Sequence, residues 1–145
     1  MDGVILLVED DPSDIDLTRR AFERDRIGNK LIVVEDGQEA LDYLFGTGQY
    51  AGRDTSEQPQ VILLDLKLPI VDGLEVLRRI RADGRTRRLP VVILTSSTEE
   101  RDKAAGYDLG ANSYVRKPVD FQQFAEAARE LGLYWLVLNE PPPKL

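Results

Sequence analysis

Five polar side chains able to take part in phosphate and metal chemistry follow short apolar runs of the chain. Glu9 and Asp10 come after the run that begins at position 4, and Asp65 comes after the run that begins at position 61. Thr95 and Lys117 follow two further runs. Apolar runs of this length predict strands that are buried on both faces of a parallel sheet. Because the carboxyl ends of parallel strands lie at one edge, we expect these side chains to converge there.

Three carboxylates gathered in one pocket predict a bound cation, because their charges repel one another unless an ion neutralises them. The chain has no histidine and no cysteine, so the ligands are oxygen atoms and the suitable ions are Mg²⁺ and Mn²⁺. A divalent ion and the Lys117 ammonium would neutralise charge on a transferring phosphoryl group while one of the carboxylates acts as nucleophile. The set therefore predicts an aspartyl phosphate, with Thr95 hydrogen-bonded to a phosphoryl oxygen.

Each of these residues also has a simpler interpretation. An acidic residue after a strand is often the cap of the next helix, and we expect Asp11, which precedes Pro12, to have that role. Thr95 by itself is uninformative, and a lone Lys117 is more often a solvated surface lysine. The agreement between four strand ends favours a site over these separate explanations.

The elements that would position the site alternate between strands and helices. Helices are predicted from position 12 to about 26, from the capping-box patterns at Asp36, Asp72 and Ser97, and from Asp120 onward. This order predicts a doubly wound α/β fold: a five-stranded parallel sheet covered on both faces by five helices. The predicted strands are 4–8, 31–34, 61–64, 90–94 and 113–115.

Two polar segments fall outside this pattern. Residues 46–58 form the longest polar loop, for which a plain insertion is favoured over a functional loop. The arginine-rich stretch 78–88 is interpreted as a solvated helix face and its continuation.

Composition limits the classes of protein to which the chain can belong. With 145 residues it is expected to form one domain, and its formal net charge of −7 disfavours nucleic acid or an anionic membrane as a partner. No apolar run approaches membrane-spanning length, and the first residues lack the basic start of a signal peptide. A cytoplasmic location is expected.

The chain contains the motifs Val8-Glu9-Asp10-Asp11, Leu63-Leu64-Asp65-Leu66-Lys67-Leu68-Pro69, Asp72-Gly73, Leu94-Thr95-Ser96 and Lys117-Pro118. Taken together, these motifs resemble the receiver domain of two-component response regulators over residues 3–132. The resemblance implies a flavodoxin-like fold with strand order 2-1-3-4-5. It also implies a phosphoacceptor signalling protein rather than an enzyme, whose phosphoryl donor is a sensor histidine kinase.

For the metal site, the resemblance implies a role for four residues. Asp65 matches the phosphoacceptor, Asp10 the acid that binds Mg²⁺ directly, and Glu9 the acid that acts through a water. The backbone carbonyl of Lys67 matches the third protein ligand. Glu9 departs from the aspartate of most members, and the long Lys67 side chain could occlude the water that removes the phosphoryl group.

For the response to phosphorylation, the resemblance implies a switch. Thr95 matches the switch hydroxyl, Tyr114 the switch aromatic residue, and Lys117 the lysine that pairs with the phosphoryl group. The Lys117-Pro118 bond is cis in the family. Phosphorylation would reshape the face made by the last two helices and strands.

Other classes of function fit the sequence less well. A phosphatase of the dehalogenase type needs an acid two residues after the nucleophile, where this chain has Lys67. A flavodoxin-like binding module needs a phosphate-cradling loop after the first strand, which here ends in acids. A receiver-shaped scaffold that is never phosphorylated stays open, as does a relay that passes phosphate to a histidine phosphotransfer protein.

After position 132 the chain continues as an extension, 133–145, with an apolar segment and a proline-rich tail and no expected output domain. The apolar run Leu133–Leu138 either folds back over the domain or meets a partner. A homodimer interface that includes Tyr134, Trp135 and Leu138 is favoured over a purely intramolecular cover. This segment, with the 46–58 loop and the Glu9-Asp10 pair, resembles the small regulators paired with bacterial phytochrome kinases.

Overall fold

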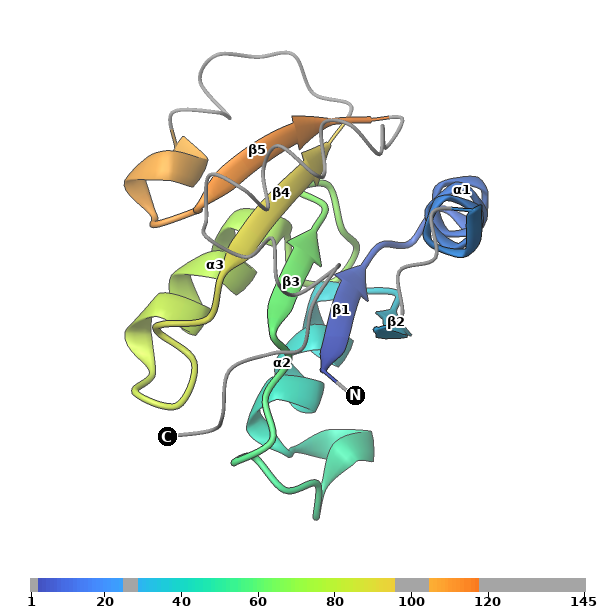
Figure 1. Ribbon diagram of the computed structural model, residues 1–145. Coiled ribbons are helices and arrows are strands. Elements are labelled where there is room, and N and C mark those ends of the chain that lie inside the picture. The colour runs from blue at the N-terminus through green and yellow to red at the C-terminus, as the bar shows by residue number, and fades with distance from the viewer. Residues whose placement is uncertain (1–2, 25–28, 96–104, 118–145) are drawn as a thin grey trace.

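The structure is a computed structural model that describes residues 3–24, 29–95 and 105–117 (Figure 1). Residues 105–108 are helical, which agrees with a helix ending near position 109. The predicted start of that helix at Ser97 and the predicted last helix lie outside the described residues. The elements are strands β1 (Val4–Val8), β2 (Lys30–Val34), β3 (Val61–Leu64), β4 (Val91–Thr95) and β5 (Ser113–Arg116), helices α1 (Pro12–Arg24), α2 (Gly37–Phe45) and α3 (Gly73–Ala82), and the 3₁₀ turn η1 (Gly48–Tyr50).

The strands form one parallel sheet in the order β2-β1-β3-β4-β5, which confirms the predicted fold and strand order. In the register of the central strands, Val8 of β1 pairs with Leu64 of β3. The ladder continues one residue further, because the backbone N–H of Asp65 donates to the Val8 carbonyl at 3.0 Å. Glu9 and Asp65 therefore leave the sheet at the same edge.

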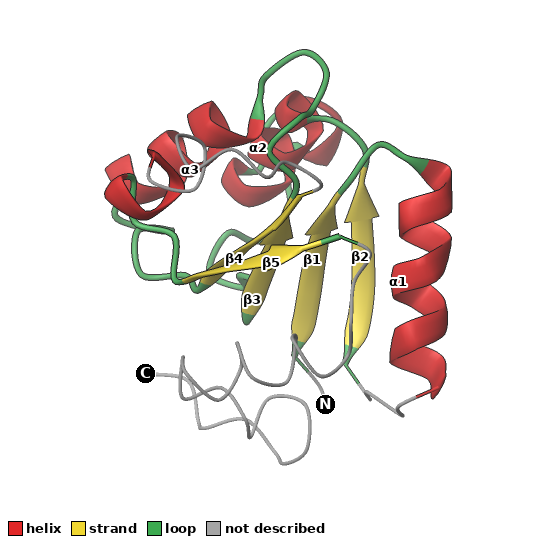
Figure 2. Cartoon of the chain, turned by 90° about the horizontal axis from the view of Figure 1, so that it is seen from above, coloured by secondary structure: helices red, strands yellow, loops and turns green. Residues whose placement is uncertain are grey.

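The sheet separates two hydrophobic cores, because successive side chains of a strand point to opposite faces. On one face Ile5 and Leu63 pack with Phe22 of α1. On the other face Leu6 and Ile62 pack with residues of α2 and α3. Figure 2 shows α1 on one side of the sheet and α2 with α3 on the other. Strands buried on both sides explain why the apolar runs are continuous instead of alternating.

Side chains at the helix starts fix where the helices leave the sheet edge. Asp36 accepts a hydrogen bond from the backbone N–H of Glu39 at 2.6 Å, and Asp72 accepts one from the N–H of Glu75 at 3.0 Å. Asp11 accepts a hydrogen bond from the Ser13 N–H at 2.8 Å. These contacts confirm the caps predicted for α1, α2 and α3.

The polar segment 46–58 is folded against the C-terminal half of α2. The guanidinium of Arg53 lies 4.1 Å from the centroid of the Tyr43 ring, and its Nε donates to the Tyr43 carbonyl at 2.5 Å. The side-chain amide of Gln58 donates to the Leu44 carbonyl at 2.9 Å. The Tyr50 hydroxyl donates to Glu39 Oε2 at 2.8 Å. Polar side chains of this segment thus bond carbonyl groups at the C-terminal end of α2.

Among the described residues, no helix is both long enough and apolar enough to cross a membrane.

Candidate functional site

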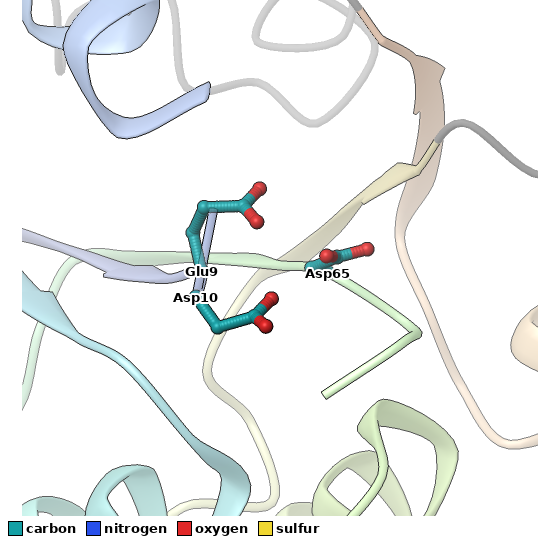
Figure 3. Close-up of side chains that lie close together, drawn as sticks. All are labelled: Glu9, Asp10 and Asp65. Atoms are coloured by element: carbon teal, nitrogen blue, oxygen red, sulfur yellow. The ribbon is translucent and has the colours of Figure 1, made fainter. Parts of the chain in front are cut away.

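Three carboxylates meet where β1 and β3 end. One carboxylate oxygen from each of Glu9, Asp10 and Asp65 lies within 4.8 Å of the others. Glu9 and Asp65 are buried, at 2% and 6% exposure, whereas Asp10 is exposed. Figure 3 shows the Glu9 and Asp10 side chains extending from the end of β1 toward the side on which Asp65 lies. The predicted convergence of these acids is confirmed, because β1 and β3 are direct neighbours in the sheet.

Lys117, the residue directly after β5, reaches two of these carboxylates. Its Nζ forms an ion pair with Glu9 Oε1 and lies 3.2 Å from Asp65 Oδ2. A third carboxylate, Asp14 in the first turn of α1, has its Oδ2 at 2.9 Å. The Lys117 side chain is only 9% exposed, so its charge is balanced by these carboxylates more than by water.

Burial and the ion pairs act in opposite directions on the charged groups of the site. Burial raises the pKa of Glu9 to about 7, and the hydrogen bond from Lys117 opposes that rise. Burial alone would lower the pKa of Lys117, but hydrogen bonds to Glu9 and Asp14 and the charge of Asp65 raise it above its usual value. Lys117 is therefore a permanent cation at neutral pH.

The loop between β3 and α3 is built tightly around Asp65. A Cβ atom added to Gly73 would lie 2.2 Å from the carbonyl oxygen of Asp65. Ile70, which lies between Asp65 and Gly73 in the chain, has a positive φ of 71°. It is the central residue of a γ-turn in which the Val71 N–H donates to the Pro69 carbonyl at 2.8 Å. Since β-branched residues rarely adopt a positive φ, this conformation is strained and was not predicted from the sequence.

The comparisons with known proteins agree with this geometry. The family model of the response regulator receiver domain matches residues 5–129 of the chain. The chain belongs to the response regulator receiver family.

Three similar proteins are response regulators, and two of them are named as phytochrome response regulators. The structure of bacteriophytochrome response regulator RtBRR is 55% identical, with a TM-score of 0.85, covering 99% of this chain and 86% of that one. The response regulator Rcp1 of Synechocystis sp. is 38% identical over 92% of this chain and 88% of its own length. A structure of Rcp1 in its Mn²⁺-bound form superimposes with a TM-score of 0.78 at 35% identity, covering 97% and 99% of the two chains.

The third is the cyanobacterial phytochrome response regulator RcpA, whose structure is of the phosphorylated form. It is 36% identical, with a TM-score of 0.77, and the match covers 98% of both chains. The protein is thus a receiver-type response regulator related to phytochrome response regulators, and it works in phosphorylation-based two-component signalling with a histidine kinase as partner.

Receiver domains bind Mg²⁺ in an acidic pocket, and the carboxylates of this receiver fit that ion. Glu9, Asp10 and Asp65 offer oxygen atoms only, which are the donors that hard divalent cations prefer. Asp10 is exposed, so water can supply the remaining ligands that Mg²⁺ usually keeps. For Lys67, the structure shows an exposed side chain and a backbone N–H that lies 3.4 Å from Asp65 Oδ1.

The predicted switch residues lie on the two strands beyond the acid cluster. Thr95 ends β4 and pairs in register with Arg116 of β5, so its backbone is at the site edge, while its side chain lies outside the described part. The Tyr114 ring, half-buried in β5, lies 6.4 Å from that of Tyr107, centroid to centroid. The Lys117-Pro118 bond and the predicted interface residues Tyr134, Trp135 and Leu138 are outside the described residues.

Sequence reasoning missed Asp14, although its carboxylate contacts Lys117. In the sequence it is an ordinary acid in the first turn of a helix, and 103 positions separate it from Lys117. One pattern could have indicated it: α1 begins at the same sheet edge as the site, so its first turn lies beside the pocket. Of the predicted residues, the structure brings together Glu9, Asp10, Asp65 and Lys117.

Proposed function

We propose that Asp65 is the residue that accepts the phosphoryl group. The observation that carries this proposal is the position of its buried carboxylate, between the Lys117 ammonium at 3.2 Å and the acid pair Glu9 and Asp10. A carboxylate oxygen of Asp65 would attack phosphorus as the bond between phosphorus and the donor breaks, and the leaving group takes the electron pair of that bond. The protein would promote this transfer on itself and the later loss of its phosphoryl group, without acting as an enzyme on other substrates.

The other residues of the site would provide charge and orientation. Glu9, Asp10 and Asp65, with the backbone carbonyl of Lys67, would hold Mg²⁺. When bound, this ion supplies positive charge to the phosphoryl oxygens as the transfer proceeds. Lys117 would supply a second cation beside them, since its ammonium already contacts Asp65.

We further propose that Thr95 and Tyr114 transmit the phosphorylated state. Both lie on strands next to the site, and Tyr114 packs near Tyr107, whose side chain is 44% exposed. A hydrogen bond from the Thr95 hydroxyl to a phosphoryl oxygen would draw the end of β4 toward Asp65. Repacking of the tyrosine rings would then change the surface next to β5.

The kinase that we propose as donor is a bacterial phytochrome. Support comes from the relatives, since RtBRR is a bacteriophytochrome response regulator and RcpA is a phytochrome response regulator.

The cytoplasm is the proposed location, because ATP-dependent kinases act there. Incubation of the phosphorylated protein with a histidine phosphotransfer protein would distinguish a relay, which loses its phosphoryl group to that acceptor, from a terminal regulator, which keeps it.

Homodimerisation through Tyr134, Trp135 and Leu138 is a separate proposal. It rests on the apolar run at positions 133–138 in the extension that follows the proposed receiver unit, residues 1–132. Light scattering should give a dimer mass for the unmodified protein and a monomer mass for Trp135→Ala. An unchanged mass in both Trp135→Ala and Leu138→Ala would show that the interface lies elsewhere.

Incubation with acetyl phosphate and Mg²⁺ tests the phosphoacceptor proposal. The unmodified protein should form an acid-stable, base-labile adduct, and Asp65→Asn should form none. Asp108→Asn removes a carboxylate from an exposed position and should be labelled like the unmodified protein. No adduct on the unmodified protein would refute phosphorylation, and steady hydrolysis of phosphate esters would indicate a phosphatase.

A further inference from the structure

Asp14 contacts the site but belongs to neither the acid cluster nor the proposed switch. Its Oδ2 lies 2.9 Å from Lys117 Nζ, and its side chain is 25% exposed, compared with 2% for Glu9 and 8% for Asp65. Of the carboxylates around Lys117, Asp14 is thus the one with most access to water. It is also the one that comes from a helix, since Glu9 and Asp65 follow strands.

The hydrogen-bonding capacity of Lys117 is fully used in this arrangement. A lysine ammonium has three N–H donors and no acceptor. Here those donors face Glu9, Asp14 and Asp65. To bond an oxygen of an incoming phosphoryl group, Lys117 must therefore release one of its present partners.

Burial decides which partner is released at the lowest cost. Separating Lys117 from Glu9 would leave a carboxylate that is only 2% exposed with the bound Mg²⁺ as its one remaining cation, which is unfavourable. The Asp14 carboxylate can instead be hydrated when the lysine moves away, because water already reaches it. Asp65 itself would carry the phosphoryl group and stay beside the lysine, so of the other two contacts the one between Asp14 and Lys117 should break first.

We propose that Asp14 is a positioning residue that competes with the phosphoryl group for Lys117. In the unphosphorylated protein it holds the ammonium on the α1 side of the pocket, joining the first turn of α1 to the end of β5. When Asp65 carries a phosphoryl group, Lys117 turns to the phosphoryl oxygens and Asp14 is released to solvent. This inference rests on the proposal that Asp65 is the phosphoacceptor.

The test measures the rate of labelling by acetyl phosphate and the affinity for beryllofluoride, which mimics a phosphoryl group. In Asp14→Asn both should increase by about fivefold, because a competitor of modest strength has been removed. The matched control is Asp16→Asn, which removes a carboxylate of the same helix that pairs with Arg20 at 2.9 Å and not with Lys117. Asp16→Asn should change both quantities by less than about twofold.

A second background separates competition for Lys117 from simple repulsion of an anion. In Lys117→Ala, adding Asp14→Asn should give no gain in beryllofluoride affinity, since there is no ammonium left to release. A gain of equal size with and without Lys117 would overturn the inference in favour of general electrostatics. A purely structural role for this first-turn acid would lower the melting temperature of Asp14→Asn without accelerating labelling, which would also overturn it.

The outcomes for the two proposals remain distinct. If the unmodified protein is labelled at Asp65 and Asp14→Asn behaves identically, the role of Asp14 is refuted and the phosphoacceptor role stands. If the unmodified protein is not labelled at all, both are refuted.

Discussion

The ammonium nitrogen of Lys117 lies 3.2 Å from Asp65 Oδ2, although 52 residues separate the two positions in the chain. The contact spans the width of two strand spacings, because β4 lies between β3 and β5 in the sheet. It exists only because the strands are parallel and end at one edge. The relationship makes the stability of this edge and its chemistry depend on the same few side chains.

Replacing Lys117 by methionine should destabilise the metal-free protein by about 3 kcal/mol, because the buried Glu9 carboxylate loses its cation. Mg²⁺ should recover part of this loss, since the ion neutralises the same acids. Urea unfolding with and without Mg²⁺ measures both effects. The gain from Mg²⁺ should be larger in Lys117→Met than in the unmodified protein, and an equal gain would show that lysine and metal do not share these carboxylates.

Replacing Gly73 by alanine should disturb the phosphorylation site, because the added Cβ would lie 2.2 Å from the Asp65 carbonyl oxygen and 2.6 Å from Leu66 Cα. We expect a loss of about 1–3 kcal/mol in the free energy of unfolding and slower labelling by acetyl phosphate. Gly84→Ala is the matched control, since an added Cβ there meets nothing within 4 Å. Equal effects of the two substitutions would contradict the close packing at Asp65.

Replacing Tyr50 by phenylalanine should weaken the attachment of segment 46–58 to α2. The lost hydrogen bond from the Tyr50 hydroxyl to Glu39 should cost about 1 kcal/mol at neutral pH. Burial and the neighbouring Glu39 raise the pKa of Tyr50 from 10.0 to about 12, so the folded state favours the protonated hydroxyl. This contribution is complete below pH 10 and is lost as the pH rises through the interval from 10.0 to about 12.

Unfolding of the unmodified protein and Tyr50→Phe across this range provides the measurement, with Tyr107→Phe as the control. The difference between the unmodified protein and Tyr50→Phe should be constant from pH 7 to 9 and should shrink above pH 10. A difference that grows at high pH would mean that the ionised hydroxyl is the favoured form.

Replacing Lys67 by alanine should shorten the lifetime of the phosphoryl group. The side chain is exposed two residues after Asp65, where it could restrict the approach of water to phosphorus. Loss of about 1 kcal/mol from the hydrolysis barrier corresponds to about fivefold faster decay. Decay of labelled protein after removal of the phosphoryl donor gives this rate, with exposed Lys30→Ala as the control. An unchanged or slower decay in Lys67→Ala would exclude shielding by this side chain.

Much of the fold could be predicted because its determinants are local. Continuous apolar runs such as 61–64 indicate strands buried on both faces, and Asp36 and Asp72 mark helix starts through their own capping hydrogen bonds. The meeting of Glu9, Asp10 and Asp65 also followed from pattern, since the parallel sheet places those strand ends at one edge.

The features that escaped prediction depend on contacts between distant residues. The start of α1 at the site edge places Asp14 near the pocket, but the sequence does not indicate that its carboxylate meets Lys117. Nothing in segment 46–58 indicates that Arg53 and Gln58 bond the carbonyl groups at the end of α2. Ile70 has a β-branched side chain that is poorly suited to a positive φ, and its turn is closed by the hydrogen bond from the Val71 N–H to the Pro69 carbonyl.

The most direct test of Asp65 as the phosphoacceptor determines which residue carries the phosphoryl group. The protein is labelled with acetyl phosphate and Mg²⁺ and reduced with borohydride, which converts an aspartyl phosphate to homoserine. Peptide mass spectrometry then identifies the reduced position. We expect homoserine at position 65 alone in the unmodified protein, and none in Asp65→Asn. Homoserine at Asp10 or at another carboxylate, with Asp65 unmodified, would contradict this assignment.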